Sequence, residues 1–312
     1  MSAAIVTVTL NPAIDLTAAI ANFRAGEVNR VAWEQADPGG KGVNVASFLA
    51  DFGFFVTATG ILGQENAGIF DVLFERKGIG NEFVVIPGRT RTNIKIIDEV
   101  QDRVTDINFP GLSPSDNAVQ RLHSAIDQLA RTHDWFILSG SLPAEMPTSI
   151  YADLIKRLKA IGKTVVLDAS GESLRQAIPA APLMVKPNIA ELEEAMGRSL
   201  PTLDDRLEAA RELLAQGIST VVISLGAEGA LFVETGSAVW ARPPQIAVIS
   251  TVGAGDAMVS GFVTAKLRNF DLSDCARLAT AFSIGALSQV GPRLPPKEVV
   301  ESFMDQVSVE GV

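Results

Sequence analysis

Two glycine-rich stretches of the chain contain residue types that could bind a phosphate group. Residues 39–42 (GGKG) place one lysine among glycines, and residues 253–256 (GAGD) place one acidic residue after them. A helical sequence pattern follows each stretch. The first N–H groups of a helix lack internal partners and attract anions, and glycine lets a large anion approach the backbone closely. Both stretches are therefore candidate phosphate sites.

The acidic residue of the second stretch, Asp256, lies in the first turn of the predicted helix. A carboxylate beside an anion site could accept the proton of a hydroxyl group that attacks a phosphorus atom. Asp256 could instead be only an acid at a helix N-terminus, which stabilises a helix by about 0.3–1 kcal/mol. One short glycine motif does not decide between the two interpretations.

Neither stretch fits the well-known nucleotide-binding motifs. A Walker A loop needs a glycine five positions before its Gly-Lys-Ser/Thr, but Gln35 stands there and Gly42 follows the lysine. Residues 162–164 (GKT) match better locally, yet Arg157 replaces the first glycine and a strand follows rather than precedes them. A dinucleotide fingerprint would need a third glycine at Met258. The sequence thus argues against a P-loop and against a dinucleotide-dependent enzyme.

Strand-like and helix-like segments alternate along most of the chain, and they must position these two stretches. Apolar runs such as residues 5–10 and 164–168 are typical of buried strands, and residues 149–162 form an amphipathic pattern typical of a helix. This alternation predicts an α/β fold with a mostly parallel central sheet and helices on both faces. Ligands of such sheets bind at the carboxyl ends of the strands.

Two segments interrupt the alternation with period-two patterns and no intervening helix. They are residues 27–35 and residues 91–108, the second with a turn near residues 99–102. We expect them to form a small antiparallel sheet beside the main one. That sheet could be an ordinary edge hairpin, or a lid that closes over a substrate and excludes water.

The overall composition limits the classes of function. The chain has 312 residues, 47% of them hydrophobic, which is enough for one large domain or two small ones. Its formal net charge of −10 argues against a general nucleic-acid or anionic-membrane binder. Cys275 is the single cysteine. A secretory signal peptide needs a positively charged start, but no Lys or Arg precedes Arg24. A cytoplasmic location is expected. Prolines and glycines break the apolar segment 243–265, so we interpret it as strand, turn and buried helix rather than a membrane span.

A set of short motifs, in a fixed order, resembles the ribokinase-like PfkB sugar kinase family. The motifs are TLNPAID (9–15), GGKGVN (39–44), TRTN (90–93), SGSLP (139–143), KPNIAE (186–191), SLGAEGA (224–230) and TVGAGD (251–256). The resemblance runs from about residue 4 to beyond residue 293. It implies one ribokinase-like domain over residues 1–312, a three-layer sandwich with a discontinuous β lid formed by about 14–36 and 88–110.

Residues 9–15 (TLNPAID), 26–31 (GEVNRV) and 104–111 (VTDINFPG) are similar to the branch of the family that phosphorylates fructose 1-phosphate. The resemblance implies ATP- and Mg²⁺-dependent phosphorylation of D-fructose 1-phosphate at the 6-hydroxyl, giving fructose 1,6-bisphosphate by direct transfer. Sister kinases that act on tagatose 6-phosphate or fructose 6-phosphate share nearly every motif and stay open as alternatives. A non-catalytic sugar-phosphate sensor is a further alternative, although such a protein could have lost Asp256 or the pair Asn188 and Glu191.

The resemblance also assigns roles to individual residues. Asp256 would be the catalytic base, and the N–H groups of Gly253, Ala254 and Gly255 would stabilise the transferring phosphoryl group. The residues expected to bind the acceptor are Asp15, Gly39, Gly40, Lys41, Asn44, Arg91 and Ser139. The residues expected to border the nucleotide are Lys186, Asn188, Ser224, Gly226, Gly229 and Thr251. Asn188 and Glu191 would place Mg²⁺, largely through water.

Charge and assembly give the remaining expectations. Lys41 and Arg91 are the candidate counter-charges for the phosphate that the acceptor already carries. The resemblance implies a monovalent cation such as K⁺ near backbone atoms of Ser250, Val252 and the region of residue 291, and a homodimer through the lid strands. His123 and His133 lie outside every motif and are expected to be structural, and no His or Cys cluster suggests zinc.

Overall fold

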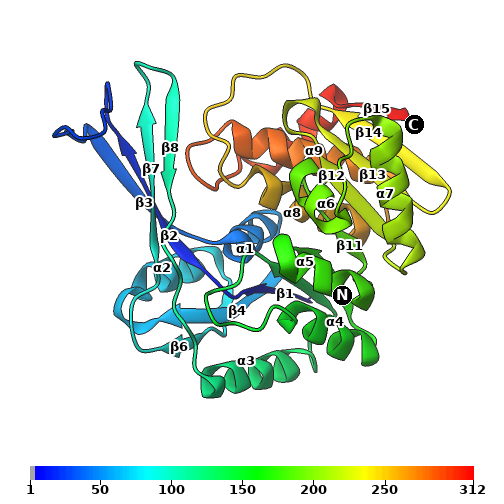
Figure 1. Ribbon diagram of the computed structural model, residues 1–312, viewed down its shortest axis with the longest axis horizontal. Helices are drawn as coiled ribbons and strands as arrows, with labels where there is room; N and C mark the ends of the chain where they lie inside the picture. Colours follow the sequence, from blue (N-terminus) through cyan, green and yellow to red (C-terminus); the bar gives the residue numbers. More distant parts are fainter. Residues whose placement is uncertain (1–3) are drawn as a thin grey trace.

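The buried β-branched runs form one large mixed sheet at the centre of the protein (Figure 1). The computed structural model describes residues 4–312, in which this sheet has eleven strands in the order β15-β14-β13-β12-β11-β10-β9-β1-β4-β5, with β6 also paired to β4. The pairs from β12 to β5 are parallel, whereas β13, β14 and β15 are antiparallel at one edge. The strand bounds are β1 (Ala4–Thr9), β4 (Phe55–Gly63), β5 (Gly80–Asn81), β6 (Val84–Ile86), β9 (Trp135–Ser139), β10 (Thr164–Asp168), β11 (Met184–Val185), β12 (Thr220–Ser224), β13 (Ala230–Glu234), β14 (Ser237–Arg242) and β15 (Ser308–Gly311).

Helices cover both faces of this sheet and make the molecule three-layered. Within β9, Phe136 and Leu138 point into one core and Ile137 into the other, because successive side chains of a strand point to opposite faces. One face carries α1 (Lys41–Asp51), α2 (Gly68–Lys77), α8 (Ala254–Leu267), α9 (Leu272–Leu287) and α10 (Lys297–Ser302). The other carries α3 (Asp116–Leu129), α4 (Ile150–Ala160), α5 (Gly171–Ala177), α6 (Ile189–Met196) and α7 (Leu203–Ala215). Short 3₁₀ turns lie at η1 (Gln64–Asn66), η2 (Ile178–Ala180), η3 (Gly226–Glu228) and η4 (Phe303–Gln306).

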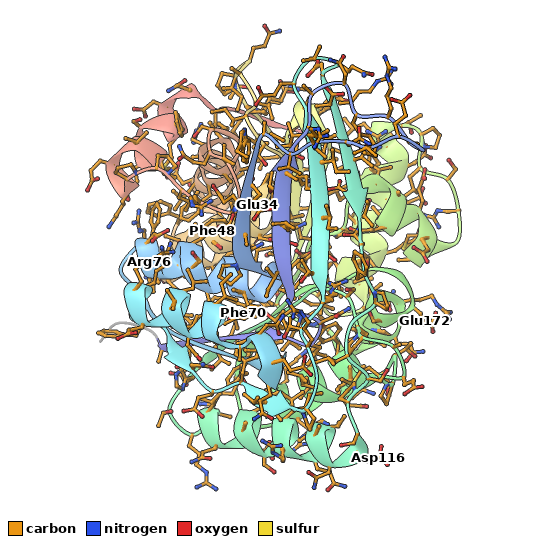
Figure 2. The ribbon with its side chains drawn as sticks, turned by 90° about the vertical axis from the view of Figure 1, so that its left-hand side faces the viewer. Glu34, Phe48, Phe70, Arg76, Asp116 and Glu172 are labelled. Atoms are coloured by element: carbon orange, nitrogen blue, oxygen red, sulfur yellow. The ribbon has the colours of Figure 1, made fainter. Side chains whose placement is uncertain are left out.

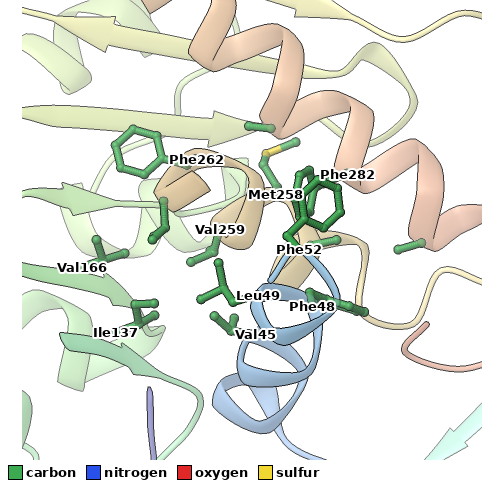
Figure 3. Packing of buried hydrophobic residues seen from close by; sticks show 14 of the residues in the cluster. Val45, Phe48, Leu49, Phe52, Ile137, Val166, Met258, Val259, Phe262 and Phe282 are labelled. Carbon is green, nitrogen blue, oxygen red and sulfur yellow. The ribbon is translucent and has the colours of Figure 1, made fainter. Parts of the chain in front are cut away.

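Close packing between α1 and α8 brings the two glycine-rich stretches together. Figure 3 shows Val45 and Leu49 of α1 beside Val259 of α8, all fully buried. The rings of Phe52 and Phe282 lie with their centroids 4.1 Å apart and join α9 to the same cluster. Interiors of this density resist displacement. The first turns of α1 and α8, which contain the second half of each stretch, are therefore held in a fixed relation.

A separate four-stranded sheet, which we call the lid sheet, has the order β3-β2-β7-β8. Its strands stand side by side in Figure 2, where Glu34 marks β3. Their bounds are β2 (Ala13–Ala19), β3 (Trp33–Gly39), β7 (Thr92–Asp98) and β8 (Arg103–Ile107). The expected hairpin is formed by β7 and β8. The expectation of a wholly antiparallel sheet is wrong, because its central pair, β2 and β7, is parallel.

The first lid segment also begins later than its sequence pattern suggested. Residues 27–32 form a loop, and the strand starts only at Trp33. The Asn29 side chain accepts from the N–H of Arg24 and donates to the carbonyls of Arg24 and Glu27. Such local side-chain to backbone hydrogen bonds compete with strand pairing. Among residues 4–312, no helix combines the length and apolar character that crossing a bilayer requires.

Candidate active site

Polar side chains meet at the carboxyl ends of three neighbouring strands. In the parallel register Thr9 of β1 pairs with Ser139 of β9, and Ser139 pairs with Asp168 of β10, so their side chains share one face. All three residues are buried, and Thr9 Oγ1, Ser139 Oγ and Asp168 Oδ2 have no hydrogen-bond partner among residues 4–312. Buried polar atoms without partners are rare in folded proteins. This edge of the sheet therefore has the character of a binding site.

Asp168 holds two lysines at this edge. Its Oδ1 lies 3.2 Å from Lys41 Nζ and 3.4 Å from Lys186 Nζ. Burial alone would raise the pKa of Asp168, but the ammonium groups of Lys186 and Lys41 outweigh it and lower that pKa below its ordinary value. Burial disfavours the charged form of Lys41, yet Asp168 and Asp256 raise its pKa above the usual range. Lys41 is thus held as a cation, and Lys186 lies beside the same carboxylate. Asp168 was not expected from the sequence, although its place at the end of an apolar strand (TVVLD) could have indicated it.

Asp256 lies where the sequence placed it, in the first turn of α8, and is buried. Its Oδ2 accepts a hydrogen bond of 2.8 Å from Nδ2 of Asn44. Burial is the main cause that raises the pKa of Asp256 to about 6, the neighbouring carboxylate of Asp168 adds to it, and Lys41, Asn44 and Lys186 oppose it. Gly253 precedes the helix with φ of 79°, a left-handed conformation that glycine adopts without strain. Asp256 is therefore a carboxylate at a helix N-terminus with a pKa close to neutrality.

The last contact closes a ring of polar groups. A Cβ atom added to Gly255 would lie 3.4 Å from Lys186 Nζ, so this ammonium lies against the N-terminus of α8. We call Lys41, Asn44, Asp168, Lys186, Gly255 and Asp256 the charged ring. It joins a carboxylate that can accept a proton, two lysines and the N–H groups of a helix N-terminus, of which that of Ala254 donates to the carbonyl oxygen of Thr251 at 3.5 Å. These are the groups that phosphoryl transfer requires, namely a base and stabilisers of negative charge.

The pKa of Asp256 predicts the pH dependence of turnover. A carboxylate accepts a proton only when it is ionised, so activity should fall as the pH drops through about 6 and should be level above pH 7. The measurement is kcat/KM for the phosphate acceptor between pH 5 and pH 8, at saturating ATP. A midpoint near pH 4, the ordinary value for an aspartate, would contradict the assigned burial effect.

A pocket of about 260 Å³ opens between the lid sheet and the loops that hold Val252 and Gly291. Its other lining residues are Asp15, Thr17, Asp37, Asn93, Ile94, Lys95, Asp106, Asn108 and Pro292. Nδ2 of Asn93 donates to Oδ1 of Asp15 at 3.1 Å, and burial raises the pKa of Asp15 above its ordinary value. A Cβ atom on Gly39 would lie 2.4 Å from Oδ2 of Asp15, so this glycine leaves room for the carboxylate. The lid pocket thus lies beside Gly39, which leads into α1, and its lining contains no residue of the charged ring.

The residues expected to bind the acceptor fall in different places. Asp15 lines the lid pocket, whereas Asn44 belongs to the charged ring and Ser139 is fully buried beneath it. Gly40 has φ of 108°, and a Cβ there would lie 2.9 Å from Cα of Pro12, so packing against the chain already requires a glycine at this position.

The two cations expected to face the acceptor's phosphate are engaged elsewhere. Lys41 is bound to Asp168, beside Asp256, and does not line the lid pocket. Arg91 donates through Nη1, Nη2 and Nε to the carbonyls of Phe109, Asn11 and Pro12. A guanidinium has five N–H groups, so two of them have no partner among residues 4–312 and could meet a phosphate.

The residues expected around the nucleotide lie along one side of the charged ring. Asn188 and Glu191 form a capping box at the start of α6, in which each side chain accepts from the backbone N–H of the other. Ser224 ends β12 and forms a bridge to Asn188. Gly226 and Gly229 follow in a turn, and a Cβ on Gly229 would lie 2.0 Å from the carbonyl oxygen of Ala241, which alone explains this glycine. Thr251 is exposed just before α8.

The remaining expected residues lie in the loops beside the lid pocket or, for the two histidines, away from the charged ring. Val252 and Gly291 both line the lid pocket. Oγ of Ser250 accepts a hydrogen bond from the N–H of Val252 at 3.2 Å. The two loops expected to bind a monovalent cation therefore lie beside the same pocket. His123 contacts Arg157, and His133 lies 3.1 Å from Oγ1 of Thr57. Neither histidine lies at the charged ring.

The chain is similar to known proteins over nearly its whole length. The profile of the pfkB family of carbohydrate kinases matches residues 5–298. The chain belongs to this family. A 1-phosphofructokinase of Rhodobacter capsulatus is 47% identical to it over 311 residues, which cover 99% of this chain and 98% of the relative. Phosphofructokinase-2 from Escherichia coli, solved in complex with potassium, has a TM-score of 0.90 at 28% identity, covering 98% of this chain and 99% of that chain. A protein described as a possible 1-phosphofructokinase from Thermotoga maritima has a TM-score of 0.90 at 28% identity over 99% of both chains.

Family membership confirms the expected ribokinase-like α/β fold and the expected class of activity. This pfkB kinase is a phosphotransferase that acts on a sugar phosphate. A kinase of this kind uses ATP together with a metal ion, and the charged ring fits that chemistry. Asp168 Oδ2 is buried without a partner among residues 4–312, and Oε1 of Glu191 is not used in the capping box. Carboxylate oxygens that hold a hydrated cation are typical of magnesium sites.

Proposed function

We propose that this pfkB kinase transfers the γ-phosphoryl group of ATP to the 6-hydroxyl of D-fructose 1-phosphate and forms fructose 1,6-bisphosphate. The observation that carries the proposal is the place of Asp256, at the N-terminus of α8 and 2.8 Å from Asn44. The 47% identity to a 1-phosphofructokinase over nearly the whole chain supports this choice of acceptor.

In this proposal the acceptor lies in the lid pocket, with its hydroxyls against Asp15 and Asn93. Asp256 accepts the proton of the attacking hydroxyl, which is possible at pH 7 because its pKa is about 6. The N–H groups at the start of α8 and the ammonium groups of Lys41 and Lys186 stabilise the charge of the transferring group. The acceptor's own phosphate is met by the two free N–H groups of Arg91 and by Lys95, which lines the pocket. No covalent enzyme intermediate is needed.

The nucleotide is proposed to border Ser224, Gly226, Gly229 and Thr251, with its phosphates toward Lys186. Magnesium, held through water by Asn188, Glu191 and Asp168, neutralises charge on the phosphates when it is bound. A monovalent cation such as K⁺ is proposed at the loops of Val252 and Gly291, since the Escherichia coli relative has been solved in complex with potassium. The buried single cysteine, Cys275, is consistent with the proposal of a cytoplasmic enzyme.

The test is a coupled assay of ADP formation with fructose 1-phosphate, fructose 6-phosphate and tagatose 6-phosphate in turn. Fructose 1-phosphate should give the highest kcat/KM, by about tenfold or more, because a misplaced phosphate loses its charged contacts. Fructose 6-phosphate is the second candidate, since the Escherichia coli relative has been solved in complex with it. A higher kcat/KM with either of the other two sugars would overturn the proposed acceptor.

Replacing Lys41 by methionine should lower kcat by about 10²–10³-fold, the usual cost of removing one group that stabilises transition-state charge. KM for the sugar phosphate should change little, because Lys41 lies at Asp168 rather than in the lid pocket. Steady-state kinetics with each substrate varied in turn provide the measurement. Lys163→Met, which removes a lysine paired with Asp134 far from the ring, is the matched control. A rise in KM alone would restore the earlier expectation that Lys41 binds the acceptor's phosphate.

We also propose that two copies associate through their lid sheets. The edge strands β3 and β8 have no further strand partner among residues 4–312, and Trp33 and Val104 on them are 40% and 59% exposed. Unpaired strand edges with exposed apolar side chains favour association.

The protein should therefore have twice the mass of the 33.0 kDa chain in light scattering. The double substitution Trp33→Asp and Val104→Asp should yield monomers, whereas Val72→Asp, an exposed position on α2, should not. A monomeric wild type at micromolar concentration would contradict the proposal.

A further inference from the structure

An ion pair joins the lid sheet to the loop that follows α9. Nη2 of Arg293 donates to Oδ1 of Asp37 on β3, and Nη1 lies 3.3 Å from Oδ2 of the same carboxylate. Nη1 also donates to the carbonyl of Val290 at 2.7 Å, which fixes the guanidinium to its own loop. Asp37 is only 7% exposed and also accepts from Nε2 of Gln35 at 2.6 Å. A two-point contact between Arg and a carboxylate is geometrically specific as well as attractive.

The local backbone is shaped around this pair. Gly291 has φ of +72°, and a Cβ there would lie 2.6 Å from Oδ2 of Asp37 and 2.7 Å from Nη1 of Arg293. A side chain at residue 291 would therefore push the loop off the ion pair. Asp37 and Pro292 line both the lid pocket and a second cavity of about 450 Å³, which is also lined by residues of α1, α2 and the segment after α9. The pair thus stands in the wall between the two cavities.

We infer that Asp37 and Arg293 form a latch that positions the lid strands over the acceptor. The kinetic part of this inference rests on the proposed function. Asp37 is directly paired with Asp15 in the β2–β3 register. Strand β3 continues through Gly39 into α1, which carries Lys41 and Asn44. By fixing β3 at Asp37, the latch fixes the carboxylate of Asp15 that lines the pocket. Arg293 acts through Asp37 and is a positioning residue.

The latch has a specific kinetic signature. The acceptor depends on the lid strands, whereas the residues proposed for the nucleotide lie on β12, α6 and the start of α8, none of which belongs to the lid sheet. Loss of the latch should therefore weaken acceptor binding and leave nucleotide binding nearly unchanged. A general loss of folding would not separate the two substrates in this way.

The experiment compares wild type, Arg293→Gln, Arg293→Lys, Asp37→Asn and the double variant Asp37→Asn/Arg293→Gln. Arg293→Gln should raise KM for the sugar phosphate about tenfold and change KM for ATP less than about twofold. Arg293→Lys should recover part of that loss because it keeps a cation. The double variant should be no worse than the poorer single variant, since residues that act as one unit are not additive. Arg198→Gln removes a comparable pair with Glu212, far from the lid, and should leave both KM values unchanged.

A second readout does not depend on catalysis. Backbone amides of β3 should exchange with deuterium faster in Arg293→Gln than in wild type, in the full-length protein without substrates. Unchanged exchange in β3, or an equal rise in KM for both substrates, would overturn the latch. If the wild type phosphorylates none of the sugar phosphates, the proposed function fails. The exchange rates still decide the latch in that case.

Discussion

The Asp256→Asn enzyme is expected to lose about 10²–10⁴-fold in kcat, the usual contribution of a positioned general base. Asparagine keeps the size of the side chain and can still accept the hydrogen bond from Nδ2 of Asn44, so the geometry of the charged ring should persist. It cannot accept a proton from the attacking hydroxyl. The measurement is kcat at saturating substrates, together with nucleotide affinity by calorimetry, which should stay close to that of wild type.

The same substitution should make the protein more stable. The pKa of Asp256 is about 6, roughly two pH units above the ordinary value of 3.8, so the ionised carboxylate is disfavoured by folding. That difference corresponds to about 3 kcal/mol at pH 7 as an upper figure. A group whose folded pKa is raised loses stability as the pH rises from about 4 to about 6. Asp256→Asn should therefore melt at a higher temperature than wild type at pH 7, and the difference should vanish below about pH 4.

Asp274→Asn is the matched control, because Asp274 also lies in the first turn of a helix, α9, but away from the ring. It should leave kcat unchanged and alter stability by less than about 1 kcal/mol. If Asp256→Asn retains near-normal turnover, Asp256 is not the base. If turnover falls and stability falls with it, the loss reflects damage to the fold.

Among the proposed substitutions, Asp168→Asn should have the second largest effect. It should lower both the free energy of unfolding and kcat. The carboxylate is fully buried between Lys41 and Lys186, and its removal leaves two ammonium groups close together with only Asp256 nearby as a counter-charge. Breaking a buried ion pair in this way costs about 3–5 kcal/mol, and the lower figure applies here because the side chain of Lys41 is 36% exposed. Thermal denaturation measures the loss, and kcat should fall because the lysines are no longer held in place.

The pH dependence of this effect has the opposite sign to that of Asp256. The pKa of Asp168 is held below its ordinary value, so its stabilisation is present above about pH 4 and is lost as the pH falls. The difference between wild type and Asp168→Asn should therefore shrink in acid. Adding Lys41→Met to Asp168→Asn should restore part of the stability, since one unneutralised cation is removed, but no activity.

Asp134→Asn is the control for this second substitution, because Asp134 pairs with Lys163 at 2.8 Å but is 75% exposed. Exposed pairs contribute about 0–1 kcal/mol, so little change is expected. If Asp168→Asn is as stable as wild type, the lysines are not held by this carboxylate and the ring is not the rigid unit proposed here.

The sequence by itself determined the fold class and the place of Asp256, the proposed base, in the first turn of a helix. Runs of β-branched residues with helical patterns between them predict a parallel sheet, because such strands are buried on both faces. Local chemistry made Asp256 a candidate base, since glycines followed by an acid at a helix start place a carboxylate beside an anion site. The order of the short motifs indicated the pfkB kinase family.

Only the tertiary structure decided which side chains meet. Asp168 lies at the end of a strand. No sequence pattern says that Lys41, which is 127 residues before it, and Lys186, which follows it, converge on its carboxylate. The sequence placed Lys41 at the acceptor's phosphate, but the turn into α1 directs it to Asp168. Arg293 and Asp37 are 256 residues apart. Local rules describe the backbone over a few residues, whereas ion pairs depend on how the layers pack, so these contacts and the parallel pairing within the lid sheet could be read only from the folded chain.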